Sequence, residues 1–285
     1  MATRRCWLVF TEYTEAMKTI AFIGGGNMAS AIIGGLLKSG RSVTSLIVVE
    51  PHEAQRLTLL ADFNLTALPA ADASLARADG VVWAVKPQLF VSAALPCAAH
   101  LSRALHLSVM AGIRSDSIAS AVSSQRVVRA MPNTPALIGQ GVSGLFARTA
   151  VTAAEKLQIE MLLAPTGQTL WVDQETDIDA VTALSGSGPA YGFYFIEAMI
   201  QAATDMGLSA AQGRQLALAT FAGSTALAQA SDEPPQVLRD RVTSKGGTTF
   251  AALAAMEAAC VKSAIVSAIR AAQKRAHELG NEFGN

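Results

Sequence analysis

The chain has 285 residues, of which 51% are hydrophobic and 15% are charged, and its 22 basic residues balance 22 acidic ones. This length is enough for one large or two modest domains with a hydrophobic core. The balanced charge provides no basic surface for nucleic acid, and no basic amphipathic stretch indicates a membrane surface. We therefore expect the partner to be a small molecule or a second copy of the chain.

The cysteines and histidines are too scattered to predict a metal site or a disulfide framework. None of the cysteines forms a Cys-x-x-Cys pair, and no histidine lies at a zinc-ligand spacing from another. The residues are Cys6, Cys97, Cys260, His52, His100, His106 and His277. We expect a reduced, cytoplasmic protein without a metal ion.

Residues 1–16 contain one short apolar patch, at positions 7–10. This patch is too short for a secretory signal and far too short to span a bilayer. The first predicted strand begins directly after Met17. We therefore expect residues 1–16 to be a dispensable extension, of the kind that an upstream start codon would add.

The first half of the chain alternates short apolar strands with helices such as Met28–Ser39 and Glu53–Ala61. The predicted strands are Thr19–Ile23, Ser45–Glu50, Gly80–Val85, Leu105–Val109, Val127–Ala130 and Val142–Phe146. Nearly continuous apolar strands separated by helices are typical of a parallel sheet covered on both faces. We predict a doubly wound α/β domain over residues 17–172, with its ligand at the carboxyl ends of the strands.

Between Lys18 and Ala31 an apolar strand breaks into a glycine turn and restarts as a helix of small residues. Gly24 permits the tight turn, Gly26 lets the backbone approach a phosphate, and Ala29 takes the third position of a Gly-x-Gly-x-x-Gly pattern. The pattern alone also fits a structural turn, but the flanking strand and helix favour a site for a dinucleotide pyrophosphate. The predicted contacts are Gly24, Gly25, Gly26, Asn27, Met28 and Ala29.

Three further segments follow predicted strands and are expected at the same sheet edge. Asn133 would pair with a carboxamide, and Thr134 would hydrogen-bond at the reaction centre. The other predicted cofactor contacts are Ala84, Val85, Lys86, Pro87, Ala111 and Gly112. The segment that contains Lys86 is explained equally well by an ordinary turn at the end of a strand, with the lysine side chain in solvent.

Glu50 ends the second predicted strand, where an acidic side chain binds a ribose 2′-hydroxyl and repels a 2′-phosphate. This position favours NADH. His52 and Arg56 follow closely and offer groups that would accommodate a phosphate. The choice between NADH and NADPH stays open at this point.

From Glu175 onward the pattern predicts helices only, in an all-α domain over residues 173–285. The predicted helices are Glu175–Leu184, Pro189–Met206, Ala210–Ala230, Gln236–Arg241, Thr248–Met256 and Lys262–Leu279. Residues 191–203 are apolar on nearly every helical face and need burial all round. We expect this helix to pack against a second subunit, the alternative being a central helix within one chain's bundle.

Two segments of the helical half, 184–191 and 242–249, cluster hydroxyls and glycines at a helix start. Capping explains one Ser or Thr, but it does not explain Gly-Gly-Thr-Thr after Ser-Lys, because glycines weaken a helix start. We interpret the second segment as a cradle for a carboxylate. Neither segment contains a histidine or a carboxylate, which disfavours an alcohol dehydrogenase and favours reduction of an imine.

Together these segments resemble pyrroline-5-carboxylate reductase, the last enzyme of proline synthesis, over about residues 18–276. The matching stretches are 23–29, 84–88, 131–135, 184–191 and 242–249, of which the last is the most specific. The resemblance implies reduction of L-Δ1-pyrroline-5-carboxylate to L-proline by NADPH or NADH. It also implies a homodimer with interlocked C-terminal helices and an active site shared by two subunits, with decamers among the higher assemblies.

The resemblance also implies individual roles. Ser244 and Thr249 would be catalytic, with Ser244 and the backbone of residues 247–249 on the carboxylate and the Thr249 hydroxyl on the ring nitrogen. Asn133 and Thr134 would border the nicotinamide. The implied substrate-binding set is Ser185, Ser244, Gly246, Gly247, Thr248 and Thr249. Relatives often have proline at the position of Lys245. The Lys245 side chain would either attract the substrate carboxylate or lie in solvent, and we favour the second alternative.

Two other functions compete with this one. A β-hydroxyacid dehydrogenase would need a catalytic lysine on a C-terminal helix, and neither Lys262 nor Lys274 has a supporting motif. A protein that senses NAD(P) without turnover would have lost its hydroxyl donors, yet the serines and threonines of both segments are present.

Overall fold

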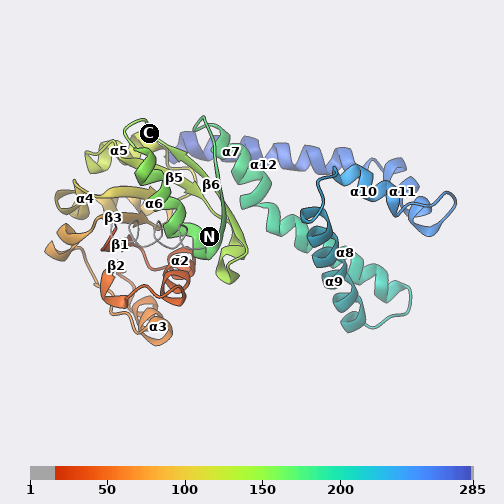
Figure 1. Cartoon of the computed structure of the whole chain (residues 1–285), viewed down its shortest axis with the longest axis horizontal. Coiled ribbons are helices and arrows are strands. Elements are labelled where there is room, and N and C mark those ends of the chain that lie inside the picture. The colour runs from red at the N-terminus through yellow and green to blue at the C-terminus, as the bar shows by residue number, and fades with distance from the viewer. Residues whose placement is uncertain (1–16, 284–285) are drawn as a thin grey trace, which may run out of the picture. The chain divides into compact units, whose positions relative to one another are not determined.

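The computed structural model describes residues 17–283, so the predicted extension over residues 1–16 lies outside the described residues (Figure 1). Two compact units are present, and each is described by itself. The first comprises residues 17–187 and 272–283, and the second is Gly188–Ala271. The change from strands to helices that the sequence predicts after residue 172 falls within the first unit.

A seven-stranded sheet forms the centre of the first unit. Its strands are β1 (Ile20–Ile23), β2 (Leu46–Val49), β3 (Gly80–Trp83), β4 (Leu105–Ser108), β5 (Val127–Met131), β6 (Gly141–Ala147) and β7 (Gly167–Trp171). Their order is β2-β1-β3-β4-β5-β6-β7, with the first five parallel. Every residue of β1 to β4 is buried, which explains the continuous apolar runs in the sequence. The predicted doubly wound sheet is confirmed.

Two details of the predicted sheet were wrong. β6 pairs with β5 in antiparallel orientation, because the short connection over residues 132–140 cannot provide the crossover that a parallel pair needs. β7 was missed altogether, and it pairs with β6 in parallel orientation after a helical crossover. No residue of β7 is fully buried, so this edge strand lacks the apolar run that identified the others.

Helices cover both faces of the sheet, as predicted. Ile33 of α2 and Ile159 of α6 pack in one apolar cluster with Phe22 of β1, while Phe90 of α4 and Ile118 of α5 pack in the cluster on the other face. These helices are α2 (Asn27–Lys38), α3 (Glu53–Phe63), α4 (Phe90–Leu101), α5 (Ser115–Val122) and α6 (Ala153–Leu163). Short 3₁₀ turns occupy Val43–Ser45, Ala73–Arg77, Pro87–Leu89 (η3), Thr134–Ile138 (η4) and Ala164–Thr166.

Glu175 connects the start of the helical half to the sheet. Its Oε1 accepts hydrogen bonds from Arg129 Nη1 on β5 (2.7 Å) and from the Ser115 N–H (2.6 Å), and its Oε2 accepts from Ser115 Oγ (2.6 Å). The carboxylate thus caps α5 and neutralises the buried Arg129 cation. α7 (Asp177–Val181) follows, and the predicted helix Glu175–Leu184 continues as a π-helical turn, η6 (Thr182–Gly186).

The second unit is helical throughout but buries little of its own surface. It contains α8 (Gly188–Asp205), α9 (Ala210–Gln229), α10 (Pro235–Arg241), α11 (Thr248–Ala258) and the first part of α12 (Val261–Phe283). Only Ala203, Gly213 and Ala217 are buried, where α8 packs against α9. Phe193 and Tyr194 on α8 are 61% and 73% exposed, so the alternative of a central helix within one chain is wrong.

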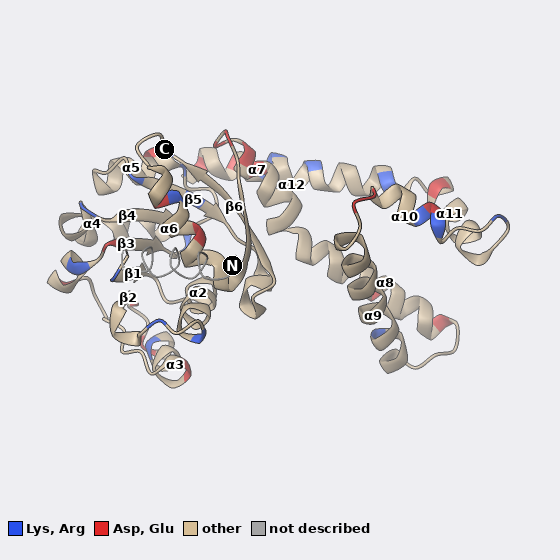
Figure 2. Cartoon of the chain, in the orientation of Figure 1, with Lys and Arg blue, Asp and Glu red and all other residues tan. Residues whose placement is uncertain are grey.

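Charged residues are sparse on α8, α9 and α11 (Figure 2). α8 carries only Glu197 and Asp205, α9 only Arg214, and α11 only Glu257. Within residues 17–283 no single helix is long and apolar enough to cross a membrane; α11 and α12 meet that criterion only as a pair bent by 54°. The uncharged surface is of the kind that a protein partner covers.

The side chain of His106 on β4 is fully buried. Its Nδ1 accepts from Trp83 Nε1 (3.1 Å), and the two rings are stacked. Burial, with a smaller contribution from the Arg126 charge, lowers the pKa of His106 from 6.5 to about 4, and a hydrogen bond with the Leu101 backbone partly opposes this shift. The side chain is therefore neutral in the folded protein at neutral pH.

We predict that His106 makes the protein less stable in mild acid. Between pH 6.5 and about 4 the unfolded chain binds a proton at His106 that the folded chain does not, so the free energy of unfolding falls as the pH falls. The full effect is on the order of 3 kcal/mol. Urea denaturation at pH 7 and pH 4.5 should show a smaller difference for His106→Phe than for the wild type. An equal difference in the two proteins would contradict this assignment.

Candidate functional site

The glycine turn after β1 is held by the strands on both sides of β1. The Gly24 N–H donates to the Val49 carbonyl at the end of β2 (2.9 Å), and the Ala84 N–H, just beyond β3, donates to the Ile23 carbonyl (2.9 Å). Gly24 has φ +96°, and a Cβ there would lie 2.6 Å from the Ala84 carbonyl oxygen. This position therefore requires glycine, as the sequence predicts.

Gly25 is fixed by two side chains from the β2–α3 region. Its N–H donates to Glu50 Oε2 (2.9 Å), and its carbonyl accepts from Gln55 Nε2 (2.6 Å). Sequence reasoning missed Gln55, because nothing in the sequence shows which residue of α3 faces the turn. These two hydrogen bonds fix the backbone of Gly25 in the turn.

Gly26 lies at the start of α2 and faces open space. No side chain caps the helix, its first turn has no acidic residue, and a Cβ on Gly26 would meet nothing within 4 Å. The N–H groups of Asn27, Met28 and Ala29 lack intrahelical acceptors at this end. Free donors, the positive end of the helix dipole and room above the glycine fit a dinucleotide pyrophosphate.

The segments after β3 and β4 lie at the same carboxyl edge of the sheet. Ala84 and Val85 are half-buried, Pro87 begins η3, and Lys86 is exposed, so both interpretations of this lysine stand. After β4, Ala111 is half-buried and Gly112 has φ +74°. A Cβ on Gly112 would lie 3.3 Å from the Leu279 carbonyl oxygen of α12.

Asn133, after β5, has a structural function that sequence reasoning did not foresee. Its Oδ1 accepts from the Val142 N–H (3.0 Å), and its Nδ2 donates to the Ser185 carbonyl in η6 (3.2 Å). Ser185 Oγ donates to the Val181 carbonyl (3.1 Å). Thr134 is exposed as the first residue of η4. The Asn133 amide therefore connects β6 and the π-helical turn to this edge of the sheet. π-Helical turns are frequent at functional sites.

The hydroxyl-rich segment of the second unit forms a tight turn before α11. The Gly247 N–H donates to the Ser244 carbonyl (3.0 Å), Gly246 has φ +73°, and a Cβ on Gly247 would lie 2.5 Å from Ser244 Oγ. Gly247 starts α11 without a side-chain cap, which leaves the N–H groups of Thr248 and Thr249 without intrahelical acceptors. Among residues 17–283 no hydrogen-bond partner occurs for the hydroxyls of Ser244, Thr248 and Thr249.

These donors suit an anionic ligand. The predicted cofactor residues lie in the first unit, together with Ser185, and the remaining predicted substrate residues lie in the second. The part of the chain that the structure describes contains no group of three or more His, Cys, Asp or Glu side chains that could hold a metal ion.

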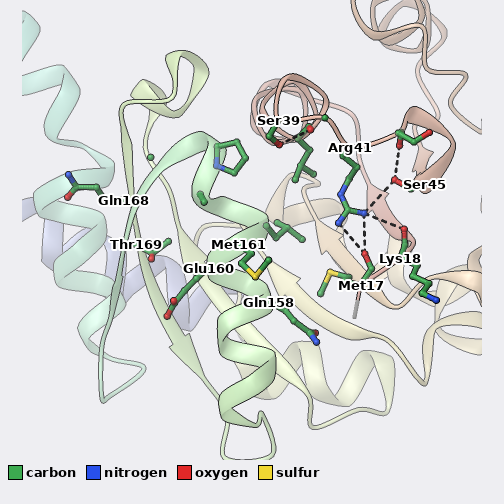
Figure 3. Close-up of a pocket in the computed structure, with 17 residues that line it drawn as sticks. Met17, Lys18, Ser39, Arg41, Ser45, Gln158, Glu160, Met161, Gln168 and Thr169 are labelled. Atoms are coloured by element: carbon green, nitrogen blue, oxygen red, sulfur yellow. Dashed lines mark hydrogen bonds between the residues drawn. The ribbon is translucent and has the colours of Figure 1, made fainter. Parts of the chain in front are cut away.

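A cavity of about 1000 Å³ lies at the opposite edge of the sheet from the glycine turn (Figure 3). Met17 and Lys18 before β1 and Ser45 before β2 line it, with the ends of α2 and α6 and the start of β7. Arg41 Nη1 donates to the carbonyls of Met17 (3.1 Å) and Lys18 (3.3 Å). Because this is the amino edge of the strands, the cavity is not part of the predicted site.

Two family models match this chain. Residues 175–279 match the family model described as pyrroline-5-carboxylate reductase dimerisation, and residues 19–112 match that described as NADP oxidoreductase, coenzyme F420-dependent. The pyrroline-5-carboxylate reductase of Pseudomonas aeruginosa is 42% identical over 241 residues, which are 84% of this chain and 88% of that relative.

Two solved structures share the fold over nearly the whole chain. The pyrroline-5-carboxylate reductase of Coxiella burnetii aligns with a TM-score of 0.84 at 33% identity, covering 92% of this chain and 98% of that one. The pyrroline carboxylate reductase of Plasmodium falciparum, with NADP bound, aligns with a TM-score of 0.82 at 30% identity over 92% and 98% of the two chains.

We predict that Gly26→Asn weakens dinucleotide binding without destabilising the fold. Asparagine is a good N-cap, so the free energy of unfolding should be unchanged or raised by a few tenths of a kcal/mol. Its side chain would occupy the space and the N–H groups meant for the pyrophosphate, raising the Kd for NADH by about tenfold or more. Isothermal titration calorimetry and urea denaturation measure the two effects.

Gly24→Ala is the matched control. It forces a Cβ into the left-handed region and against the Ala84 carbonyl, so it should lose about 1–3 kcal/mol of stability. Equal destabilisation by both variants, with no selective loss of binding at Gly26, would contradict the assignment of the two glycines.

Proposed function

Because the chain belongs to the pyrroline-5-carboxylate reductase family, we propose that it reduces L-Δ1-pyrroline-5-carboxylate to L-proline with hydride from NADPH or NADH. This is the last step of proline biosynthesis. The observation that carries the proposal is the turn over residues 244–249, which combines free hydroxyls with an uncapped helix start. The same chain also contains a glycine turn that fits a dinucleotide.

The turn before α11 supplies the donors for the substrate. Ser244 Oγ and the N–H groups of Thr248 and Thr249 would bind the carboxylate at the positive end of the helix. The Gly247 N–H is already used by the Ser244 carbonyl, so Gly247 contributes by letting Ser244 Oγ lie close to the backbone. Gly246 contributes the positive φ that the turn requires.

Thr249 would position the reacting bond. Its hydroxyl would hydrogen-bond the ring nitrogen, which fixes the C=N carbon relative to the nicotinamide. When bound, the reduced nicotinamide supplies the hydride. A protonated C=N group accepts that hydride without a general base, which agrees with the absence of histidine and carboxylate from residues 242–249.

The edge of the sheet would hold the cofactor. The glycine turn and the first turn of α2 would bind the pyrophosphate, with Glu50 near the adenosine ribose. Residues 84–87 and 111–112 would line the crevice, and Asn133 and Thr134 would border the nicotinamide. Because the amide of Asn133 is bound to the Ser185 carbonyl and the Val142 N–H, it would act chiefly as a positioning residue. Ser185 would then lie at the substrate end of the cofactor.

We also propose that the active unit is a homodimer in which α11 of one protomer completes the site on the partner's sheet edge. The exposed apolar side chains of α8 support this, because they need a cover that the second unit does not provide. A decamer of such dimers and a cytoplasmic location are part of the same proposal. We expect neither nucleic acid nor a membrane as a partner, because the overall charge is balanced.

We predict that Thr249→Val lowers kcat/KM for pyrroline-5-carboxylate by about 10- to 100-fold, because a hydrogen bond to a charged group is lost. The variant keeps the size of the side chain and leaves the helix start free. NAD(P)H oxidation with pyrroline-5-carboxylate measures the effect.

Thr243→Val in the same turn is the matched control. The Thr243 hydroxyl is satisfied by the Arg239 carbonyl (2.7 Å). Its loss should change stability more than kcat/KM. An unchanged kcat/KM in Thr249→Val, or equal losses in the two variants, would count against the role of Thr249.

A further inference from the structure

Glu50 is held in place at the end of β2 by two backbone N–H groups. Its Oε2 accepts from Gly25 (2.9 Å) and its Oε1 from His52 (2.8 Å), and the residue is only 6% exposed. Both carboxylate oxygens are anchored, so the negative charge cannot swing away from the glycine turn. No ion pair of the Glu50 carboxylate occurs among residues 17–283.

The carboxylate keeps acceptor capacity for a ligand. An ionised carboxylate offers about four lone-pair positions, and the two N–H groups use two of them. The remaining positions can accept hydrogen bonds from the hydroxyls of an adenosine ribose lying beside the turn. A 2′-phosphate offers no donor at neutral pH and brings negative charge towards the carboxylate, which repels it.

The cation that would hold a 2′-phosphate is engaged elsewhere. Arg56 Nη1 donates to the carbonyls of Glu50 (3.1 Å) and Pro51 (2.6 Å). The guanidinium is therefore turned to the main chain of the β2–α3 connection and stabilises it. His52, the other candidate, is exposed, and its backbone N–H donates to Glu50 Oε1 (2.8 Å).

From this arrangement we infer that Glu50 makes the protein select NADH over NADPH, and that Arg56 supports the connection rather than a phosphate. The inference rests on the proposed function, and it specifies the cofactor that the site uses. One side chain thus has two tasks, because the same carboxylate that discriminates at the ribose also holds the Gly25 N–H of the pyrophosphate turn.

The test is the equilibrium Kd of the purified full-length protein for NADH, NADPH, ADP-ribose and 2′-phospho-ADP-ribose, measured by calorimetry. The wild type should bind NADH more tightly than NADPH, and ADP-ribose more tightly than 2′-phospho-ADP-ribose. Glu50→Gln keeps the size and one acceptor oxygen but removes the charge, and it should shift the NADPH-to-NADH ratio of Kd towards NADPH by about tenfold or more. Arg56→Ala, the control, should change both Kd values by the same factor.

The possible results test two claims separately, the selection of NADH by Glu50 and the proposed function itself. Tighter binding of NADPH by the wild type, an unchanged ratio in Glu50→Gln, or a selective loss of NADPH binding in Arg56→Ala would overturn the inference. If Glu50→Gln does not fold, Glu50→Asp decides, because it keeps the charge and should keep the preference for NADH; loss of the preference would overturn the inference. Failure of all four ligands to bind would instead contradict the proposed function.

Discussion

The rest of the site depends on the hydrogen bonds that hold the glycine turn after β1 in place. Hydrogen bonds with the Val49 carbonyl and the Ala84 N–H fix the peptide group that precedes Gly24, and the Glu50 carboxylate fixes the N–H of Gly25. A turn so tightly enclosed determines where α2 begins. If the first N–H groups of α2 bind the pyrophosphate as proposed, the position of the whole cofactor follows from contacts made within a few residues of the turn.

The second unit depends on a different constraint. Its helices place large apolar side chains such as Phe193 and Tyr194 in solvent, and only small residues are buried where α8 meets α9. A helical segment of this kind cannot gain enough stability from its own packing. A second protomer would supply the missing contacts. In the proposed dimer, the association of the two protomers would therefore also complete the active site.

The sequence predicted the elements well where one physical signal dominated. Buried strands such as β1 and β3 have uninterrupted apolar runs, and α9 has a clear cap at Ser209. β7 was missed because its residues alternate between half-buried and exposed, and the antiparallel direction of β6 leaves no trace in hydrophobic periodicity.

Side-chain partners were the other limit of prediction from sequence. The glycine positions could be predicted because a positive φ or a close approach restricts the residue type. By contrast, the bonds of Asn133 to Ser185 and of Gln55 to Gly25 join residues far apart in the chain, which only the folded arrangement brings together. The assignment of substrate contacts to residues 244–249 still depends on the family resemblance and on the free donors found there.

Complementation between two inactive variants tests the shared active site most directly. Gly26→Trp would block the dinucleotide edge, and the double variant Ser244→Ala/Thr249→Val would disable the substrate turn. If each site combines the sheet edge of one protomer with α11 of its partner, co-expression at equal levels gives mixed dimers with one intact site. About a quarter of the wild-type activity should then return. Activity no greater than that of either variant alone, in a preparation shown to contain mixed dimers, would contradict the account.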